Sequence, residues 1–166
     1  MEGIAQKNSL EGGISPLAKA ISSMFIGEYN HSIDEKKRLS LPAKFRKELG
    51  GKVIVTRGFD NCLVVYSKGK WGQVMEEMKK ISSNRAEGRM FSRFILGGAA
   101  EVELDKLGRV LIPDYLKQYA GLKKEIVVCG LSDKLEIWDS EKWQGYKSGN
   151  EKNIDKLAEN LPELGI

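Results

Sequence analysis

The chain has 166 residues, 41% of them hydrophobic, and a formal net charge of +4 at pH 7. This is enough apolar material for one domain or for two small units that share a core. Because no apolar run approaches the roughly 18 residues needed to cross a bilayer, the composition excludes a membrane-spanning protein and predicts a soluble, cytoplasmic one.

Charge is unevenly distributed along the chain. Residues 1–23, which lack the basic start and apolar stretch of a secretion signal, hold two acids and two lysines, and residues 147–166 hold three lysines and four acids. Residues 24–146 are therefore left with a net charge of +5. A basic segment of this kind suits a nucleic-acid partner but does not require one.

The first predicted elements are a strand, a polar turn and a second short strand. Tyr29, His31 and Ile33 alternate with polar residues, which is typical of a half-buried strand. A polar turn at 34–38 then leads into RLSL at 38–41. We expect these two strands to form a hairpin.

A short helix is predicted next. Pro42 fits its first turn, and Phe45 and Leu49 are four residues apart, so they face inward together. Gly50 can adopt the left-handed conformation that often ends a helix. Two further strands, KVIVTR (52–57) and CLVVY (62–66), are joined by the turn sequence GFDN and predict a second hairpin.

Two helices are predicted in the middle of the chain, because apolar residues recur there at helical spacing. The residues on these faces are Trp71, Val74, Met75 and Met78, followed by Met90, Phe91 and Phe94.

The segment from Gly27 to Trp71 is repeated from Gly98 to Trp143, at an offset of 71 residues that becomes 72 near Lys124. The matched pairs include Gly27 and Gly98, Asp34 and Asp105, Arg38 and Arg109, Pro42 and Pro113, Gly50 and Gly121, Gly58 and Gly130, Leu63 and Leu135. The second copy therefore predicts the same elements. Its strands are centred on Val102 and Leu104, RVLI, EIVVCG and KLEIW, its second hairpin turns at GLSD, and its helix buries Leu116 and Ala120 before Gly121.

A single β-α-β-β unit buries too little surface to be stable alone. We therefore expect the two copies to pack as a pseudo-dimer within the chain. The predicted organisation is an N-terminal extension or tail (1–23), a first unit (24–70), linking helices (71–96), a second unit (97–146) and a C-terminal tail (147–166). The tail begins with the turn residues KSGN and then spaces Ile154, Leu157 and Leu161 as one weak helical face, which either docks on a neighbour or stays mobile.

Three stretches in this order resemble the MraZ family of bacterial regulators of the division and cell-wall gene cluster. They are MFIGEYNHSIDEKKRLSLPAKFR (24–46), FSRFILGGAAEVELDKLGRVLIP (91–113) and LEIWDSEKW (135–143). The resemblance covers about residues 24–146 and implies an α+β, β-rich fold of two tandem swapped-hairpin, AbrB-like units. It further implies a ring-shaped homo-oligomer that binds short direct repeats of double-stranded DNA in the promoter of that cluster. A nucleoid-associated location follows.

In the resembled family the Asp-x-x-x-Arg motifs carry the DNA contact, and both are intact here, as Asp34 with Arg38 and Asp105 with Arg109. From the residues themselves, each arginine can bind guanine O6 and N7 with two hydrogen bonds. Each aspartate can accept hydrogen bonds from turn amides or brace the guanidinium. We favour this orienting role, because phosphates repel a carboxylate.

The lysines around the two turns differ. Lys36 and Lys37 supply charge for phosphates at the first turn, and Lys44, Arg46 and Lys47 on the following helix are candidates to join them. The second turn has Lys106, followed by Leu107 and Gly108. We therefore predict that the first turn binds the DNA backbone more strongly.

No catalytic, cofactor or metal site is predicted. His31 suits a packed strand, and Cys62 and Cys129 lie in apolar runs without a CxxC motif, so buried thiols are expected. The tryptophans, together with Tyr66, are expected in the core. The row of Arg85, Arg89 and Arg93 is interpreted as a solvated or subunit-contacting surface.

Two other functions remain open. One is a ring-forming protein-interaction scaffold without DNA binding, and the other is an AbrB-like antitoxin. Antitoxins of that fold usually have one unit and a disordered tail, so two units and a short tail favour the regulator. The direction of regulation, the number of subunits and the operator sequence do not follow from the sequence.

Overall fold

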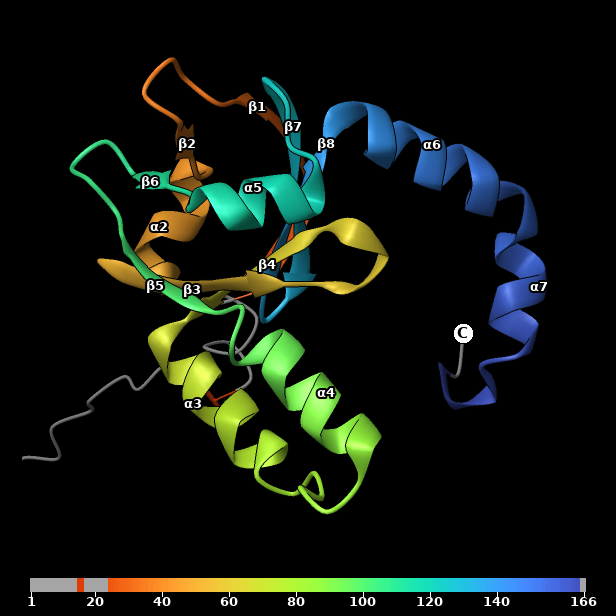
Figure 1. Ribbon diagram of the computed structural model, residues 1–166. Helices are drawn as coiled ribbons and strands as arrows, with labels where there is room; N and C mark the ends of the chain where they lie inside the picture. Colours follow the sequence, from red (N-terminus) through yellow and green to blue (C-terminus); the bar gives the residue numbers. More distant parts are fainter. Residues whose placement is uncertain (1–14, 17–23, 165–166) are drawn as a thin grey trace, which may run out of the picture.

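The structure, a computed structural model, describes residues 15–16 and 24–164 (Figure 1). The predicted extension at 1–23 lies, apart from Ser15 and Pro16, outside the described residues. The first half of the chain contains β1 (Phe25–Ser32), β2 (Arg38–Ser40), α2 (Ala43–Leu49), β3 (Lys52–Arg57), the 3-10 helix η1 (Phe59–Asn61), β4 (Leu63–Ser67), α3 (Lys68–Met78) and α4 (Ala86–Ile95). The second half contains β5 (Ala100–Glu103), β6 (Arg109–Leu111), α5 (Asp114–Ala120), β7 (Glu125–Ser132), β8 (Leu135–Asp139), α6 (Ser140–Asn150), η2 (Glu151–Asn153), α7 (Ile154–Glu159) and η3 (Pro162–Leu164).

The two repeats form one antiparallel sheet of six strands in the order β1-β7-β8-β4-β3-β5. At its centre β4 pairs with β8, and Val64 lies opposite Glu136. These two residues occupy equivalent positions in the two repeats, so a pseudo-twofold axis passes between them. The predicted second hairpins are confirmed as β3 with β4 and β7 with β8.

The first two strands of each repeat do not form the hairpin predicted from the residues, and they are exchanged between the repeats, as the resemblance to a swapped-hairpin fold implies. Strand β1 pairs with β7 of the second repeat, β5 pairs with β3 of the first, and β2 and β6 pair with each other in a separate two-stranded ribbon. Within the first repeat, the predicted hairpin retains a single bridge between Ile33 and Leu39. The exchange buries the apolar faces of strands β2 and β6, which a free hairpin would expose to water.

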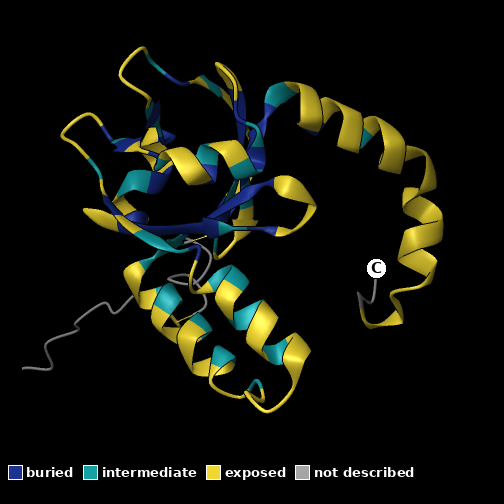
Figure 2. Ribbon diagram, in the orientation of Figure 1, coloured by how far each residue is buried: buried dark blue, intermediate teal, exposed yellow. Residues whose placement is uncertain are grey.

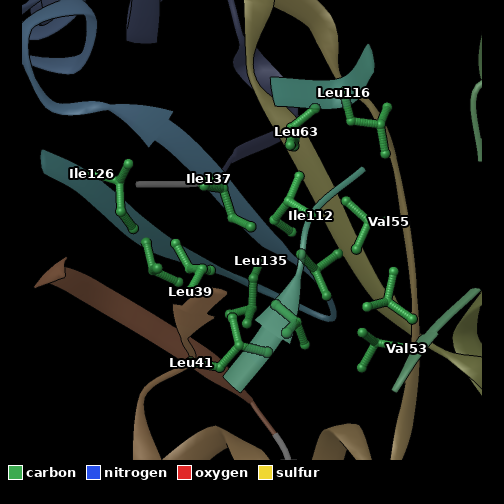
Figure 3. Packing of buried hydrophobic residues seen from close by; sticks show 14 of the residues in the cluster. Leu39, Leu41, Val53, Val55, Leu63, Ile112, Leu116, Ile126, Leu135 and Ile137 are labelled. Atoms are coloured by element: carbon green, nitrogen blue, oxygen red, sulfur yellow. The ribbon is translucent and has the colours of Figure 1, made fainter. Parts of the chain in front are cut away.

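The core lies between the sheet, the β2-β6 ribbon and helices α2 and α5, and both repeats contribute to it (Figure 3). Leu39 and Val110, at the centre of the ribbon, are 0% and 1% exposed. Burying a side chain of this size stabilises the fold by about 1.5–3 kcal/mol at most. An isolated repeat would lose the contacts that the other repeat makes with these residues, which is why the two units fold as one body.

Helices α2 and α5 bury the residues that the sequence predicts, namely Phe45 with Leu49 and Leu116 with Ala120. Gly121 ends α5 in the predicted left-handed conformation, with φ 59° and ψ 36°. Gly50 does not, because its φ of 79° is combined with a ψ of −171°. The backbone there turns directly into β3.

The predicted linking helices are confirmed as α3 and α4, which lie together on the far side of the sheet from helix α5 (Figure 1). The aromatic residues divide into two groups. Trp138 and Trp143 are buried beside Cys62 and Cys129, as predicted. Tyr66 and Trp71 are only half-buried and pack on each other at 5.6 Å between ring centroids, so their predicted place in the core is wrong.

Two predicted turns are also wrong. Strand β7 continues through Gly130 to Ser132, so the turn lies later than expected, where Leu131 N donates to Lys134 O. Helix α6 continues through the KSGN sequence to Asn150. Ser148 Oγ and Asn150 Nδ2 donate back to the carbonyls one turn earlier, so these polar side chains fit the helix.

Helices α6 and α7 curve away from the sheet, and most of their surface is exposed (Figure 2). The predicted apolar face of the tail is exposed in this chain, with Ile154 59% accessible. Within the described residues, no helix has the length and apolar character to span a membrane.

Candidate nucleic-acid interface

The first turn is organised by Asp34. Its main-chain N–H donates to Arg38 O, and the Lys37 N–H donates to Asp34 O, both at 2.9 Å. Its side-chain Oδ1 accepts hydrogen bonds from the main-chain N–H groups of Lys36 and Arg38, both at 2.9 Å. Its Oδ2 accepts a third, from Arg38 Nε at 2.8 Å. The aspartate therefore holds the turn and the arginine in one arrangement.

The second turn repeats this geometry. Asp105 Oδ1 accepts from the N–H groups of Leu107 and Arg109 at 2.9 Å, and Oδ2 accepts from Arg109 Nε at 2.7 Å. The Gly108 N–H donates to Asp105 O at 2.9 Å. The four-residue spacing has a physical reason, because one carboxylate must reach the amides two and four residues ahead. Both roles considered for the aspartates, capping the turn and bracing the arginine, occur together.

Both arginines lie on the same face of the β2-β6 ribbon. Arg38 is opposite Leu111, and Ser40 is opposite Arg109, whereas the central pair of the ribbon points into the core. Residues directly opposite share a face, so the arginines are diagonal neighbours, roughly 7–8 Å apart. Their side chains are 30% and 26% exposed. Each uses Nε for its aspartate, and within the described residues the remaining guanidinium nitrogens make no further hydrogen bond.

The two turns project from one side of the body, at the upper left of Figure 1, and are exposed in Figure 2. Each turn is flanked by a residue of the other repeat. At the first, Lys37 Nζ lies 3.1 Å from Asp114 Oδ1 of helix α5. Lys37 is thus partly neutralised, although the sequence assigns it to phosphates.

At the second turn, the flanking residue is Arg46 of helix α2. Its Nε donates to Leu41 O at 2.9 Å, and the Leu41 N–H donates to Gly108 O at 3.0 Å. A Cβ added at Gly108 would overlap the Arg46 side chain, so the guanidinium lies directly against the turn. Arg46, expected beside the first turn, therefore lies against the second.

The comparisons with known proteins agree with the duplicated architecture. A family model described as "MraZ protein, putative antitoxin-like" matches the chain twice, at residues 24–94 and 95–163. The chain belongs to the MraZ family.

Similar proteins extend over nearly the whole described part of the chain. A protein of Alkaliphilus metalliredigens is 47% identical over 143 residues, covering 86% of this chain and all of that protein. Proteins of Desulforamulus reducens and Clostridium acetobutylicum are 48% and 49% identical, covering 85% and 86% of this chain and 99% and 100% of their own lengths. All three are named "Transcriptional regulator MraZ".

In this MraZ-family chain, local hydrogen bonds lower the pKa of the aspartate in each turn. The pKa of Asp34 and that of Asp105 lie below the usual range, chiefly because each carboxylate accepts a hydrogen bond from the main-chain N–H of its arginine. Both carboxylates are therefore ionised at neutral pH. His31, half-buried on β1, has a lowered pKa because of burial and, secondarily, the nearby charge of Arg46.

The remaining basic residues near the turns are arranged differently from the prediction. Lys36 and Lys106 make no ion pair within the described residues. Lys44 instead lies over the rings of Tyr29 and Phe45 at about 5 Å, as a cation–π contact, and so packs against the core. Of the residues that flank the turns, Arg46 was expected beside the first turn and Asp114 was not predicted. The repeat alignment offered a signal for Asp114, since it aligns with Ala43.

Proposed function

We propose that the chain is a sequence-specific DNA-binding transcriptional regulator that contacts double-stranded DNA through the two Asp-x-x-x-Arg turns. The paired arginines on one face of the β2-β6 ribbon carry the proposal. A two-stranded β-ribbon fits the major groove, and an arginine with free terminal nitrogens can bind guanine O6 and N7. The names of the relatives support the same role.

The residues of the proposed interface divide by chemistry. Arg38 and Arg109 contact base edges, while Asp34 and Asp105 orient them without touching DNA. The phosphate contacts come from the lysines of the turns, which are Lys36, Lys37 and Lys106. Phosphate contacts fix the position of the protein and make binding depend on salt, whereas base contacts select the sequence.

One arginine contact supplies about 1–3 kcal/mol of base discrimination, which is too little to select one promoter in a genome. We therefore propose binding to short direct repeats by a ring-shaped homo-oligomer. Once one subunit is bound, its neighbours meet the next repeats at high effective concentration, and avidity rises by roughly 10²–10⁴ when the spacing fits. We expect the protein to act as a repressor at the promoter of its own division and cell-wall gene cluster.

The proposal is tested by a gel shift of the purified protein on the DNA directly upstream of its gene. We expect Arg38→Ala and Arg109→Ala each to weaken binding about 5- to 150-fold, as 1–3 kcal/mol implies, and the double variant to lose specific binding. Lys80→Ala is the control, because this lysine follows α3, has a side chain that is 70% exposed and lies away from the turns. Unchanged binding in the double variant would contradict the proposal.

The proposed binding to several repeats at once is tested by changing the DNA. Deleting one repeat, or inserting half a helical turn between repeats, should weaken binding much more than the loss of a single contact. Equal affinity for one repeat and for several would exclude the ring mechanism while leaving single-site binding intact.

A further inference from the structure

We infer that Arg46, a residue of the first repeat, is a phosphate contact of the second turn. The interface at that turn is then assembled from both repeats. This inference rests on the proposed function and extends it to a residue that the Asp-x-x-x-Arg motif does not contain.

The Arg46 side chain lies directly beside the second turn. Its side chain crosses Gly108 so closely that a Cβ at Gly108 would overlap Nε, Cδ and Cζ. Gly108 has φ +72° and lies between the aspartate and arginine of the turn. The guanidinium of Arg46, a half-buried residue, thus lies against the neighbour of Arg109.

The free hydrogen-bond donors of Arg46 carry the second step. Among the residues that the structure describes, only Nε has a hydrogen-bond partner, the carbonyl of Leu41 at 2.9 Å. No acid pairs with Arg46 within the described residues. A guanidinium carries five N–H donors, so the terminal nitrogens remain to bind an anion. Fixing Nε to the main chain restricts the side chain in advance, which reduces the entropy lost on binding.

The composition of the second turn carries the third step. Where the first turn has Lys36 and Lys37, the second has Leu107 and Gly108. Two positions that are cationic in the first turn are thus uncharged in the second, although Lys106 stands where the first turn has Glu35. Arg46 supplies a cation beside these two positions. Gly108 is the residue that makes room for it.

The test measures binding to the upstream duplex, and to an unrelated duplex of equal length, over a range of salt concentrations. For Arg46→Gln we expect the slope of log K against log[salt] to fall by about 0.9 for each DNA-bound subunit. The ratio of the affinities for the two duplexes should stay unchanged, because a phosphate contact is independent of sequence. Lys80→Gln, a neutralisation at an exposed residue beyond α3, should leave the slope as it is.

Two further variants separate charge from structure. Arg46→Lys keeps the charge but not the planar Nε donor, so it should retain the slope. In the double variant Arg46→Gln with Leu107→Lys, the charge returns to the turn at a residue that is 62% exposed, and the slope should recover. Equal losses in Arg46→Gln and Arg46→Lys, with no recovery in the double variant, would show that Arg46 only holds the turn.

The outcome also distinguishes this inference from the proposed function. If the double variant Arg38→Ala with Arg109→Ala loses specific binding while Arg46→Gln has the wild-type slope, the inference fails and the proposed function stands. If the wild-type protein binds neither duplex, both fail.

Discussion

The two turns have the same interior and different surroundings. In each, a carboxylate accepts hydrogen bonds from two main-chain amides and from the arginine Nε, at 2.8 Å in the first turn and 2.7 Å in the second. Around the first turn, Lys37 pairs with Asp114, whereas around the second, Gly108 is covered by Arg46. A duplicated motif has thus kept its local hydrogen bonds while its electrostatic setting depends on the other repeat.

The contacts with the other repeat change the number of free cations at each turn. The prediction that the first turn binds DNA more strongly depends on Lys36 and Lys37 both being free. One of them is paired with an acid, and the second turn gains an arginine from another helix. Counted by cations that have no ion pair among the described residues, the first turn then has Lys36 and the second has Lys106 and Arg46, so we expect the second turn to bind the DNA backbone at least as strongly as the first.

The largest expected effect concerns the residue before each arginine. Gly108 and Lys37 both have positive φ, 72° and 62°. Gly108→Ala adds a strained Cβ and displaces Arg46, and we expect it to lower the free energy of unfolding by about 2 kcal/mol. Lys37→Gly relieves strain and should raise it by about 0.5–1 kcal/mol. Urea denaturation measures both.

A double variant tests whether the overlap with Arg46 is what makes Gly108→Ala destabilising. In the Arg46→Ala background, the overlap with the guanidinium is gone, so Gly108→Ala should be less destabilising than in the wild type. Additive effects of the two substitutions would show that the two side chains do not meet.

A second expected effect concerns Asp114, which aligns with Ala43 in the first repeat. Asp114→Ala frees Lys37 and removes an acid from the interface, so DNA affinity should rise several-fold at low salt, and less at high salt. The reverse change, Ala43→Asp, places an acid below the second turn and should lower affinity. Fluorescence anisotropy with a labelled duplex measures both, and changes of the same sign would contradict the proposed symmetry of the interface.

The smallest expected effect is the pH dependence of the two aspartates. Because the pKa of each carboxyl is lower in the folded than in the unfolded chain, its contribution to stability is fully present above the unfolded pKa, about 3.9. It is lost as the pH falls through the lowered folded pKa. A carboxyl titration followed by NMR should show both groups titrating below that value, and Asp34→Asn and Asp105→Asn should each remove one of the two transitions. A lowered pKa at one turn alone would show that the turns are not equivalent inside.

Much of the candidate site could be predicted because its hydrogen bonds are local. Asp34 and Arg38 are four residues apart, and the three hydrogen bonds that the Asp34 side chain accepts are all made within that span. The four-residue spacing of Phe45 and Leu49 likewise predicted the buried face of helix α2, and the repeat predicted the same elements in the second half. The interactions of Lys37 and Arg46 could not be predicted in this way, since their partners come from the other repeat.

The sequence by itself determined the duplication, the elements of each unit and the internal geometry of both turns, because these depend on contacts between residues close along the chain. Only the tertiary structure decided that β2 pairs with β6, that Arg38 and Arg109 share one face, and which residue flanks each turn. Lys37 and Asp114 are 77 residues apart. Contacts over such a distance form when the apolar faces of both repeats are buried together, so their identity depends on how the whole core closes.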